Sequence, residues 1–65
     1  MIVKDFVEVL IKVKCSDKLI IYDSQEKGKE VYYGYVNEKQ VYKCLEDRVV
    51  DGMWIGISEV CISIN

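Results

Sequence analysis

The sequence predicts a small α+β domain in the order helix, strand, strand, helix, strand, strand. Three observations indicate this class: a first segment with charges at helical spacing, two β-branched runs on either side of a polar loop, and two alternating apolar runs at the end. We expect a four-stranded antiparallel sheet with the helices packed on one face. A chain of 65 residues is too short for two cores, so residues 1–65 are expected to form one compact domain.

Residues 3–14 are predicted to form an amphipathic helix. At about 100° per residue, four charged side chains fall within one arc of roughly 100° and apolar side chains take the remainder; the charged residues are Lys4, Asp5, Glu8 and Lys12. Only Lys14, near the end, breaks this segregation. A strand pattern fits less well, because the even positions mix apolar and charged residues. The apolar face is wide, so we expect the helix to lie across a sheet.

A β-hairpin is predicted next. Residues 19–22 form a short apolar segment with β-branched side chains, and residues 30–36 (EVYYGYV) are rich in valine and tyrosine. Both segments are therefore expected to be strands. The polar residues 23–29 lie between them and contain Gly28, the natural residue for a positive φ in a hairpin loop.

A short second helix is predicted over residues 38–47. Asn37 is a typical N-cap residue, and Gln40 follows it at capping-box spacing. From Val41 onward, apolar residues recur at the i, i+3, i+4 spacing of a helix face.

Strands are predicted again from Arg48 onward, in the runs VVDGMWIGI and VCISI. The Asp51-Gly52 pair fits a hairpin turn or a β-bulge; we favour a bulged third strand and a turn near Ser58-Glu59. The last strand has no charge after Glu59, and such a strand, if exposed, would invite edge pairing. We therefore expect it to be central in the sheet or covered by a partner, and we expect a homodimer formed by edge or face pairing.

The formal net charge is −2, with acidic and basic residues interspersed. A nucleic-acid binder normally carries a clustered positive surplus, and a DNA mimic would carry a large acidic one. We therefore expect no direct nucleic-acid binding. Charges interrupt the apolar residues at the start, and no run approaches the ~20 residues of a membrane span. We expect a complete small reading frame without a signal peptide or membrane segment.

The sequence carries little catalytic equipment. It has no histidine, the usual general base at neutral pH, and its serines have no activating base beside them in a recognisable pattern. Its glycines form no phosphate-binding motif. Cys15, Cys44 and Cys61 are widely spaced, which favours reduced, structural thiols over a metal site. We expect a protein that is not an enzyme and that binds no cofactor and no metal.

The aromatic residues are the informative group. Strand alternation directs Tyr33 and Tyr35 to one face of the sheet and Tyr32 to the other. A core on one side of the sheet cannot hide both sets, so some tyrosine is expected on the open face or at an edge. Tyrosine and tryptophan bury a large area with little loss of rotamer freedom, and they carry binding energy at many interfaces.

The chain resembles small proteins encoded by phages and prophages of low-GC bacteria. The resemblance is carried by an opening helix VKDFVEVL, a hairpin LIIYDSQEKGKEVYYGYV, a short helix ending in LEDR and two closing strands, with many lysines, isoleucines and tyrosines. Many phage proteins of this size look like anti-defence proteins, such as anti-CRISPRs that bind a Cas effector. The resemblance thus implies a cytoplasmic location in a bacterial host and a host protein as the partner.

The leading hypothesis is a non-enzymatic inhibitor that blocks a bacterial defence effector, such as a CRISPR-Cas protein, by stoichiometric binding. We expect aromatic and acidic side chains to make the contacts; the protein-binding candidates are Tyr32, Tyr33, Tyr35, Trp54, Glu30, Glu46, Asp47 and Asp51.

Two alternatives stay open. An oligomeric sponge that sequesters a nucleotide immune signal would need cations to meet phosphates; the candidates are Arg48, Lys27, Lys29 and Lys43. The other alternative is a small structural or regulatory phage protein.

Overall fold

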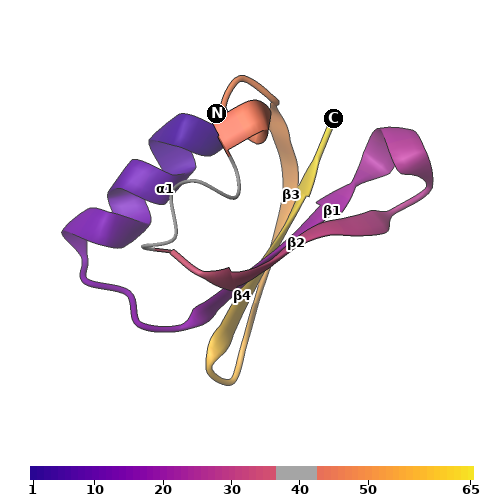
Figure 1. The fold of residues 1–65 in the computed structure, drawn as a ribbon. Helices are drawn as coiled ribbons and strands as arrows, with labels where there is room; N and C mark the ends of the chain where they lie inside the picture. Colours follow the sequence, from indigo (N-terminus) through magenta and orange to yellow (C-terminus); the bar gives the residue numbers. More distant parts are fainter. Residues whose placement is uncertain (37–42) are drawn as a thin grey trace.

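The computed structural model describes residues 1–36 and 43–65, which form one helix and a four-stranded mixed sheet (Figure 1). The elements follow in the order α1 (Val3–Lys12), β1 (Lys18–Asp23), η1 (Ser24–Glu26), β2 (Lys29–Tyr35), η2 (Lys43–Leu45), β3 (Val50–Gly56) and β4 (Glu59–Ile64), where η marks a 3-10 turn. The small α+β class and the four strands are as the sequence predicts.

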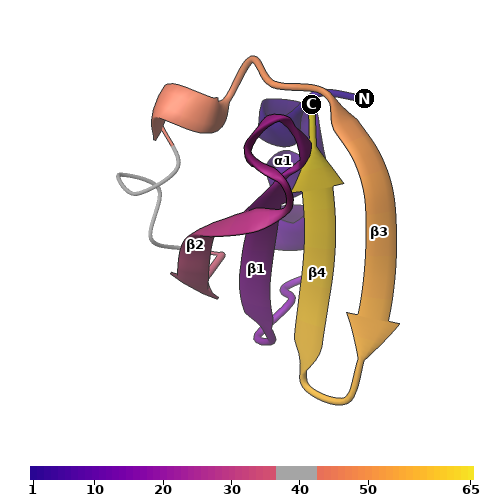
Figure 2. The same cartoon turned by 90° about the vertical axis from the view of Figure 1, so that its right-hand side faces the viewer.

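The sheet is mixed, so the prediction of a purely antiparallel sheet is wrong. The strand order is β2-β1-β4-β3; β1 pairs antiparallel with β2 and parallel with β4 (Figure 2). The cause is the connection between β2 and β3. β2 and β3 are the two edge strands, and β3 begins at the same end of the sheet as β2. A crossover of a dozen or more residues is what parallel pairing needs. The two apolar strands β1 and β4 thereby become the centre of the sheet.

The placement of β4 meets the expectation that the last strand is central. It lies between β1 and β3, so both of its backbone edges are hydrogen-bonded. The predicted bulge is confirmed as a register shift between Val50 and Gly52. The turn falls at residues 57–58, one position earlier than expected, and Ser58 has a positive φ there. Gly28 also has a positive φ, of 76°, in the β1–β2 hairpin, as predicted.

Helix α1 covers most of the segment predicted to be helical. Lys14, which breaks the charge segregation, lies just beyond its end with a positive φ. At the other end, the first backbone N–H groups of the helix donate to carbonyls of the chain after η2: Val3 to Arg48 at 2.9 Å and Lys4 to Glu46 at 3.1 Å. These bonds satisfy donors that a helix start leaves open. Within the described ranges, no helix is long and apolar enough to cross a membrane.

One core joins α1 to one face of the sheet. Val3, Phe6 and Val7 of the helix are buried together with alternate residues of the two central strands; the strand residues are Leu19, Ile21, Val60, Ile62 and Ile64. Tyr32, Val36 and Leu45 complete this core. Because strand side chains alternate, the intervening residues of β1 and β4 lie on the opposite face, which we call the open face.

The prediction of a second helix over residues 38–47 is not borne out where the structure describes that segment. Residues 37–42, including the proposed N-cap Asn37, lie outside the described residues. Lys43–Leu45 form only a 3-10 turn, followed by turn and bend residues up to Arg48. The buried Leu45 fixes this turn to the core, and the carbonyls that follow are used by α1. These contacts hold the backbone away from a continuing α-helix.

Candidate functional site

The open face of the sheet is organised as three rungs of side chains that cross all four strands. The register places partner residues on the same face, so each rung takes one residue from β2, β1, β4 and β3 in turn. The first rung is Tyr35, Lys18, Glu59 and Gly56, the middle rung is Tyr33, Ile20, Cys61 and Trp54, and the third rung is Glu30, Tyr22, Ser63 and Gly52.

The middle rung is an apolar platform with an aromatic residue at each end. Tyr33 on one edge strand is 54% exposed and Trp54 on the other is 57% exposed, whereas Ile20 between them is only 5% exposed. Three strand spacings separate the two aromatic residues, which corresponds to roughly 14 Å between their backbones. The platform therefore offers large apolar side chains to a partner without leaving its centre open to water.

Lys18 in the first rung is tied to Tyr33. Its Nζ donates to the Tyr33 hydroxyl at 3.1 Å and lies 5.1 Å from the centre of that ring. The hydrogen bond to Tyr33 raises the pKa of Lys18 above its ordinary value, and the charge interactions with Tyr33, Tyr35 and Glu59 act in the same direction. Lys18 is therefore a cation whose position is fixed by the aromatic surface.

A shallow hollow of about 500 Å³ lies between the middle and third rungs; its lining residues are Tyr22, Ser24, Gly28, Trp54, Cys61 and Ser63. The Trp54 ring leans over Gly52, since its Cη2 atom lies 3.6 Å from where a Cβ on that glycine would be. Burial raises the pKa of Tyr22, and the nearby acidic groups add to the effect. The hollow therefore presents a neutral phenol, an indole and hydroxyls, and none of the described Lys or Arg residues lines it.

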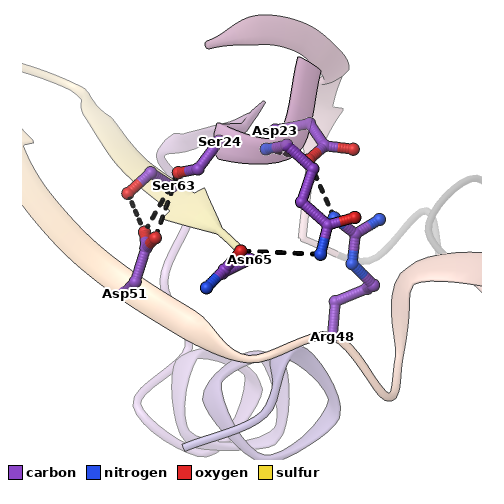
Figure 3. A network of polar contacts seen from close by, with 7 residues as sticks. Asp23, Ser24, Arg48, Asp51, Ser63 and Asn65 are labelled. Carbon is purple, nitrogen blue, oxygen red and sulfur yellow. Dashed lines mark hydrogen bonds and ion pairs between the residues drawn. The ribbon is translucent and has the colours of Figure 1, made fainter. Parts of the chain in front are cut away.

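A polar network closes one end of this face (Figure 3). The hydroxyls of Ser24 and Ser63 both donate to the carboxylate of Asp51, and the Ser24 Oγ lies 3.0 Å from Asp51 Oδ2. Asp51 is the extra residue of the bulge in β3, so the bulge aims its side chain back at the hairpin tip. The Asp51 carboxylate thus holds η1 against the start of β3.

Asp23 and Arg48 form an ion pair beside this network. The guanidinium Nη2 lies 2.8 Å from Asp23 Oδ1, and the same oxygen accepts the backbone N–H of Gln25 at 2.9 Å. The Arg48 hydrogen bond lowers the pKa of Asp23, although burial acts in the opposite direction. Gln25 also donates to Asn65 at 3.5 Å. Arg48 is therefore committed to a structural contact.

Five of the eight predicted contact residues gather at the open face. Tyr33, Tyr35, Trp54 and Glu30 lie on its rungs, and Asp51 borders it. The remaining three, Tyr32, Glu46 and Asp47, lie elsewhere in the fold.

Tyr32 points into the core, where it is 3% exposed and its hydroxyl donates to the Tyr35 carbonyl at 2.7 Å. η2 lies beside the start of α1 (Figure 1). Glu46 and Asp47 follow η2 in the chain, and the Glu46 carbonyl accepts the backbone N–H of Lys4. We therefore leave these three residues out of the open-face surface.

Sequence reasoning did not identify Ile20, Tyr22 and Cys61 as members of the same surface. Alternation along β1 places Ile20 and Tyr22 on one face, and this pattern could have predicted that they share a surface. Cys61 joins them only through the parallel register of β1 with β4, which no local pattern reveals.

The described side chains offer no arrangement suited to metal binding. Among residues 1–36 and 43–65, no group of three or more His, Cys, Asp or Glu side chains could hold a metal ion. The three cysteines are free thiols. Burial raises the pKa of Cys61, which keeps its thiol protonated at neutral pH and therefore weakly nucleophilic.

Comparisons with known proteins identify no relative of this chain. We find no protein-family model, no curated protein and no solved structure that matches the chain.

Proposed function

We propose that this chain is a non-enzymatic binding protein that contacts a partner protein through the open face of its sheet. The observation that supports the proposal is the middle rung, where Tyr33 and Trp54 stand half-exposed on either side of the buried Ile20. Aromatic side chains fixed on strands bind with little further loss of conformational freedom. Tyr35, also half-exposed, extends the same surface along β2.

The charges around this surface favour a basic partner. Glu59 and Glu30 lie on the first and third rungs, and Asp51 borders the hollow. The one lysine on the rungs, Lys18, already donates to Tyr33. Acidic groups at the rim of an apolar patch raise association rates and fix the register of a basic partner more than they add affinity.

The resemblance to phage anti-defence proteins supplies the proposed partner, a bacterial defence effector of the CRISPR-Cas kind in the cytoplasm of the host. Such effectors bind nucleic acid and carry basic surfaces, which an acid-rimmed aromatic face complements. In this proposal the chain inhibits by occupying that surface, one copy per site.

A nucleotide sponge is less well supported by the hollow. The hollow has the volume for a small ligand, but within residues 1–36 and 43–65 no Lys or Arg lines it, and Arg48 is paired with Asp23. Phosphates need cationic or backbone donors in number. A neutral aromatic ligand remains compatible with the lining, and titration with uncharged nucleosides distinguishes it from an anionic nucleotide.

The proposal is tested by titrating the chain into purified defence effectors and measuring their nuclease or target-binding activity. We expect activity to fall to completion near one equivalent of chain for the cognate effector. Tyr33→Ala, Tyr35→Ala and Trp54→Ala should each weaken this inhibition at least tenfold, as expected for residues at the centre of an interface.

The matched control is Val13→Ala, which also removes an exposed apolar side chain but lies beyond the end of α1. It should inhibit like the parent chain. If the three aromatic variants fold normally and inhibit an effector as strongly as the parent does, the open face is not the contact surface.

A further inference from the structure

The outer edge of β3 is the least protected part of the sheet. Its side chains are exposed on both faces, with Met53 at 53%, Trp54 at 57% and Ile55 at 73%. No charged residue occurs from Gly52 to Ile57. Exposed, uncharged edges of this kind pair readily with a further strand.

The opposite edge of the sheet is protected in the ways that natural sheets use. β2 begins with the charged residues Lys29 and Glu30, and a register shift between Ile21 and Tyr22 interrupts its pairing with β1. Charges and bulges both discourage a further strand. The two edges of the sheet therefore differ: the β2 edge carries charges and a bulge that discourage further pairing, and the β3 edge from Gly52 to Gly56 carries neither.

The beginning of β3 is already covered. Ile2 bridges Val49, and the Val50 N–H donates to the Met1 carbonyl at 2.8 Å. At its other end, the strand stops at Gly56 before the turn of residues 57–58. Within the described part of the chain, the open edge is therefore the short segment 52–56.

We propose that this segment pairs antiparallel with the same segment of a second copy of the chain, about a two-fold axis at Trp54. The sequence of the segment, Gly-Met-Trp-Ile-Gly, is nearly symmetric about that residue. In this register Gly52 lies opposite Gly56 of the partner subunit, and Met53 lies opposite Ile55 of the partner subunit. Like apolar groups meet, and no like charges meet.

The backbone supports this axis. A two-residue turn makes Gly56 and Glu59 a hydrogen-bonded pair, so by alternation Trp54 bonds to Cys61 and the backbone groups of Met53 and Ile55 point outward. Pairing Met53 with the partner's Ile55 uses these outward groups on both chains. The two Trp54 residues then form a non-hydrogen-bonded pair, the type in which facing side chains come closest.

The neighbours of Trp54 leave room for this contact. On the partner strand, the same-face diagonal neighbours of Trp54 would be two glycines, Gly52 and Gly56, which have no side chains to obstruct an indole. Centring the axis on Met53 would instead bring the partner strand against Val49 and Val50, where Met1 and Ile2 already pair. Centring it on Ile55 would require pairing by the turn residues.

The first test is a pair of charge variants at Met53 and Ile55. The double variant M53K/I55K places a lysine opposite a lysine of the partner at both positions and should weaken self-association by on the order of tenfold or more. The matched variant M53E/I55K carries the same number of polar replacements but places glutamate opposite lysine, so it should remain a dimer. Sedimentation equilibrium or native mass spectrometry over a range of chain concentrations measures both.

The charge pattern is specific to the axis. An axis at Met53 or at Ile55 would set like charges opposite each other in M53E/I55K as well. Parent chains that stay monomeric at all concentrations, or both variants becoming monomeric together while circular dichroism shows them folded, overturn the proposal. So does a parent chain that is monomeric alone but whose β3 edge binds a strand of another protein.

A second test uses the one tryptophan in the chain. Because each chain has a single indole, exciton coupling between two indoles in the circular dichroism spectrum can arise only between chains. We expect a couplet that grows with chain concentration and that is absent in Trp54→Phe. Met53 and Ile55 lie on the helix side of β3, not on the open face, so the association of their charge variants and the inhibition assay can fail separately.

Discussion

The guanidinium of Arg48 lies 2.8 Å from the carboxylate of Asp23, a residue that is only 6% exposed. This pair joins the end of β1 to the chain that returns from the far edge of the sheet. The same returning segment supplies carbonyls to the first turn of α1 and a bridge to Ile2. The ion pair therefore anchors the crossover that makes the sheet mixed.

Replacing Arg48 by methionine should destabilise the domain. The change keeps the aliphatic length but leaves the buried Asp23 carboxylate without its main partner, which costs more than losing an exposed pair. We expect the melting temperature to fall by about 4–8 °C or more, a large shift for a domain of this size. Lys29→Met, at an exposed position of β2, is the matched control and should leave the melting temperature nearly unchanged. Equal melting temperatures for the two variants would contradict a structural role for the pair.

The same pair should make stability depend on acid pH. The pKa of Asp23 is lower in the folded chain, because Arg48 stabilises the charged carboxylate. The folded state then binds fewer protons than the unfolded state, so the stabilisation is complete above the unfolded pKa of about 3.9 and is lost as the pH falls through the folded pKa. Urea unfolding from neutral pH to below about pH 3 should show the parent's advantage over Asp23→Asn shrinking in that window. Glu8→Gln, on the exposed side of α1, should unfold in parallel with the parent.

Two adjacent tyrosines should respond differently to loss of the hydroxyl. In Tyr32→Phe the buried donor to the Tyr35 carbonyl at 2.7 Å is lost, which should cost about 0.5–1.5 kcal/mol. In Tyr33→Phe an exposed acceptor for Lys18 is lost, and the free energy of unfolding should change by less than about 0.5 kcal/mol. Chemical denaturation of both variants measures the difference. If Tyr33→Phe were the more costly change, the assignment of the two faces of β2 would be in error.

Local patterns in the sequence predict much of this fold. The charge arc marks α1, β-branched runs mark β1 and β2, and alternation separates Tyr32 from Tyr33 and Tyr35. These features depend on neighbours within a few residues, which a sequence displays directly. The half-exposed Tyr33 and Tyr35 follow from the same alternation.

The parallel pairing of β1 with β4 could not be predicted in this way. Each hairpin is locally antiparallel, and the direction in which the second hairpin is added depends on the path of the connection between residues 36 and 49. The composition of the open face could not be predicted for the same reason, because Ile20 lies beside Cys61 only through that pairing. Ile55 is 73% exposed and Ile62 is fully buried, although both belong to similar alternating runs that no local pattern distinguishes.

The thiols of Cys44 and Cys61 should react at rates set by their surroundings. Burial raises the pKa of Cys61, and its strand is central in the sheet, whereas Cys44 is exposed. Because the thiolate is the reactive form, iodoacetamide at neutral pH should modify Cys44 at least about tenfold faster than Cys61. Peptide mass spectrometry after timed quenching gives both rates. In a denaturant the two rates should converge, and a fast Cys61 in the folded chain would contradict its placement between β1 and β3.

Two isoleucines of the closing hairpin provide the sharpest test of the core. Ile62 is fully buried in β4 and Ile57 is 97% exposed in the turn. Ile62→Ala should cost about 2–5 kcal/mol, and because a domain this small has a net stability of only about 3–5 kcal/mol, that chain should be largely unfolded. Ile62→Val removes one methylene and should fold, with a loss of about 0.5–1.5 kcal/mol. Ile57→Ala, the same change of side chain at the exposed site, should alter the free energy of unfolding by less than about 0.5 kcal/mol. Urea unfolding followed by circular dichroism ranks the three variants, and a folded Ile62→Ala as stable as Ile57→Ala would show that β4 does not form the centre of the core.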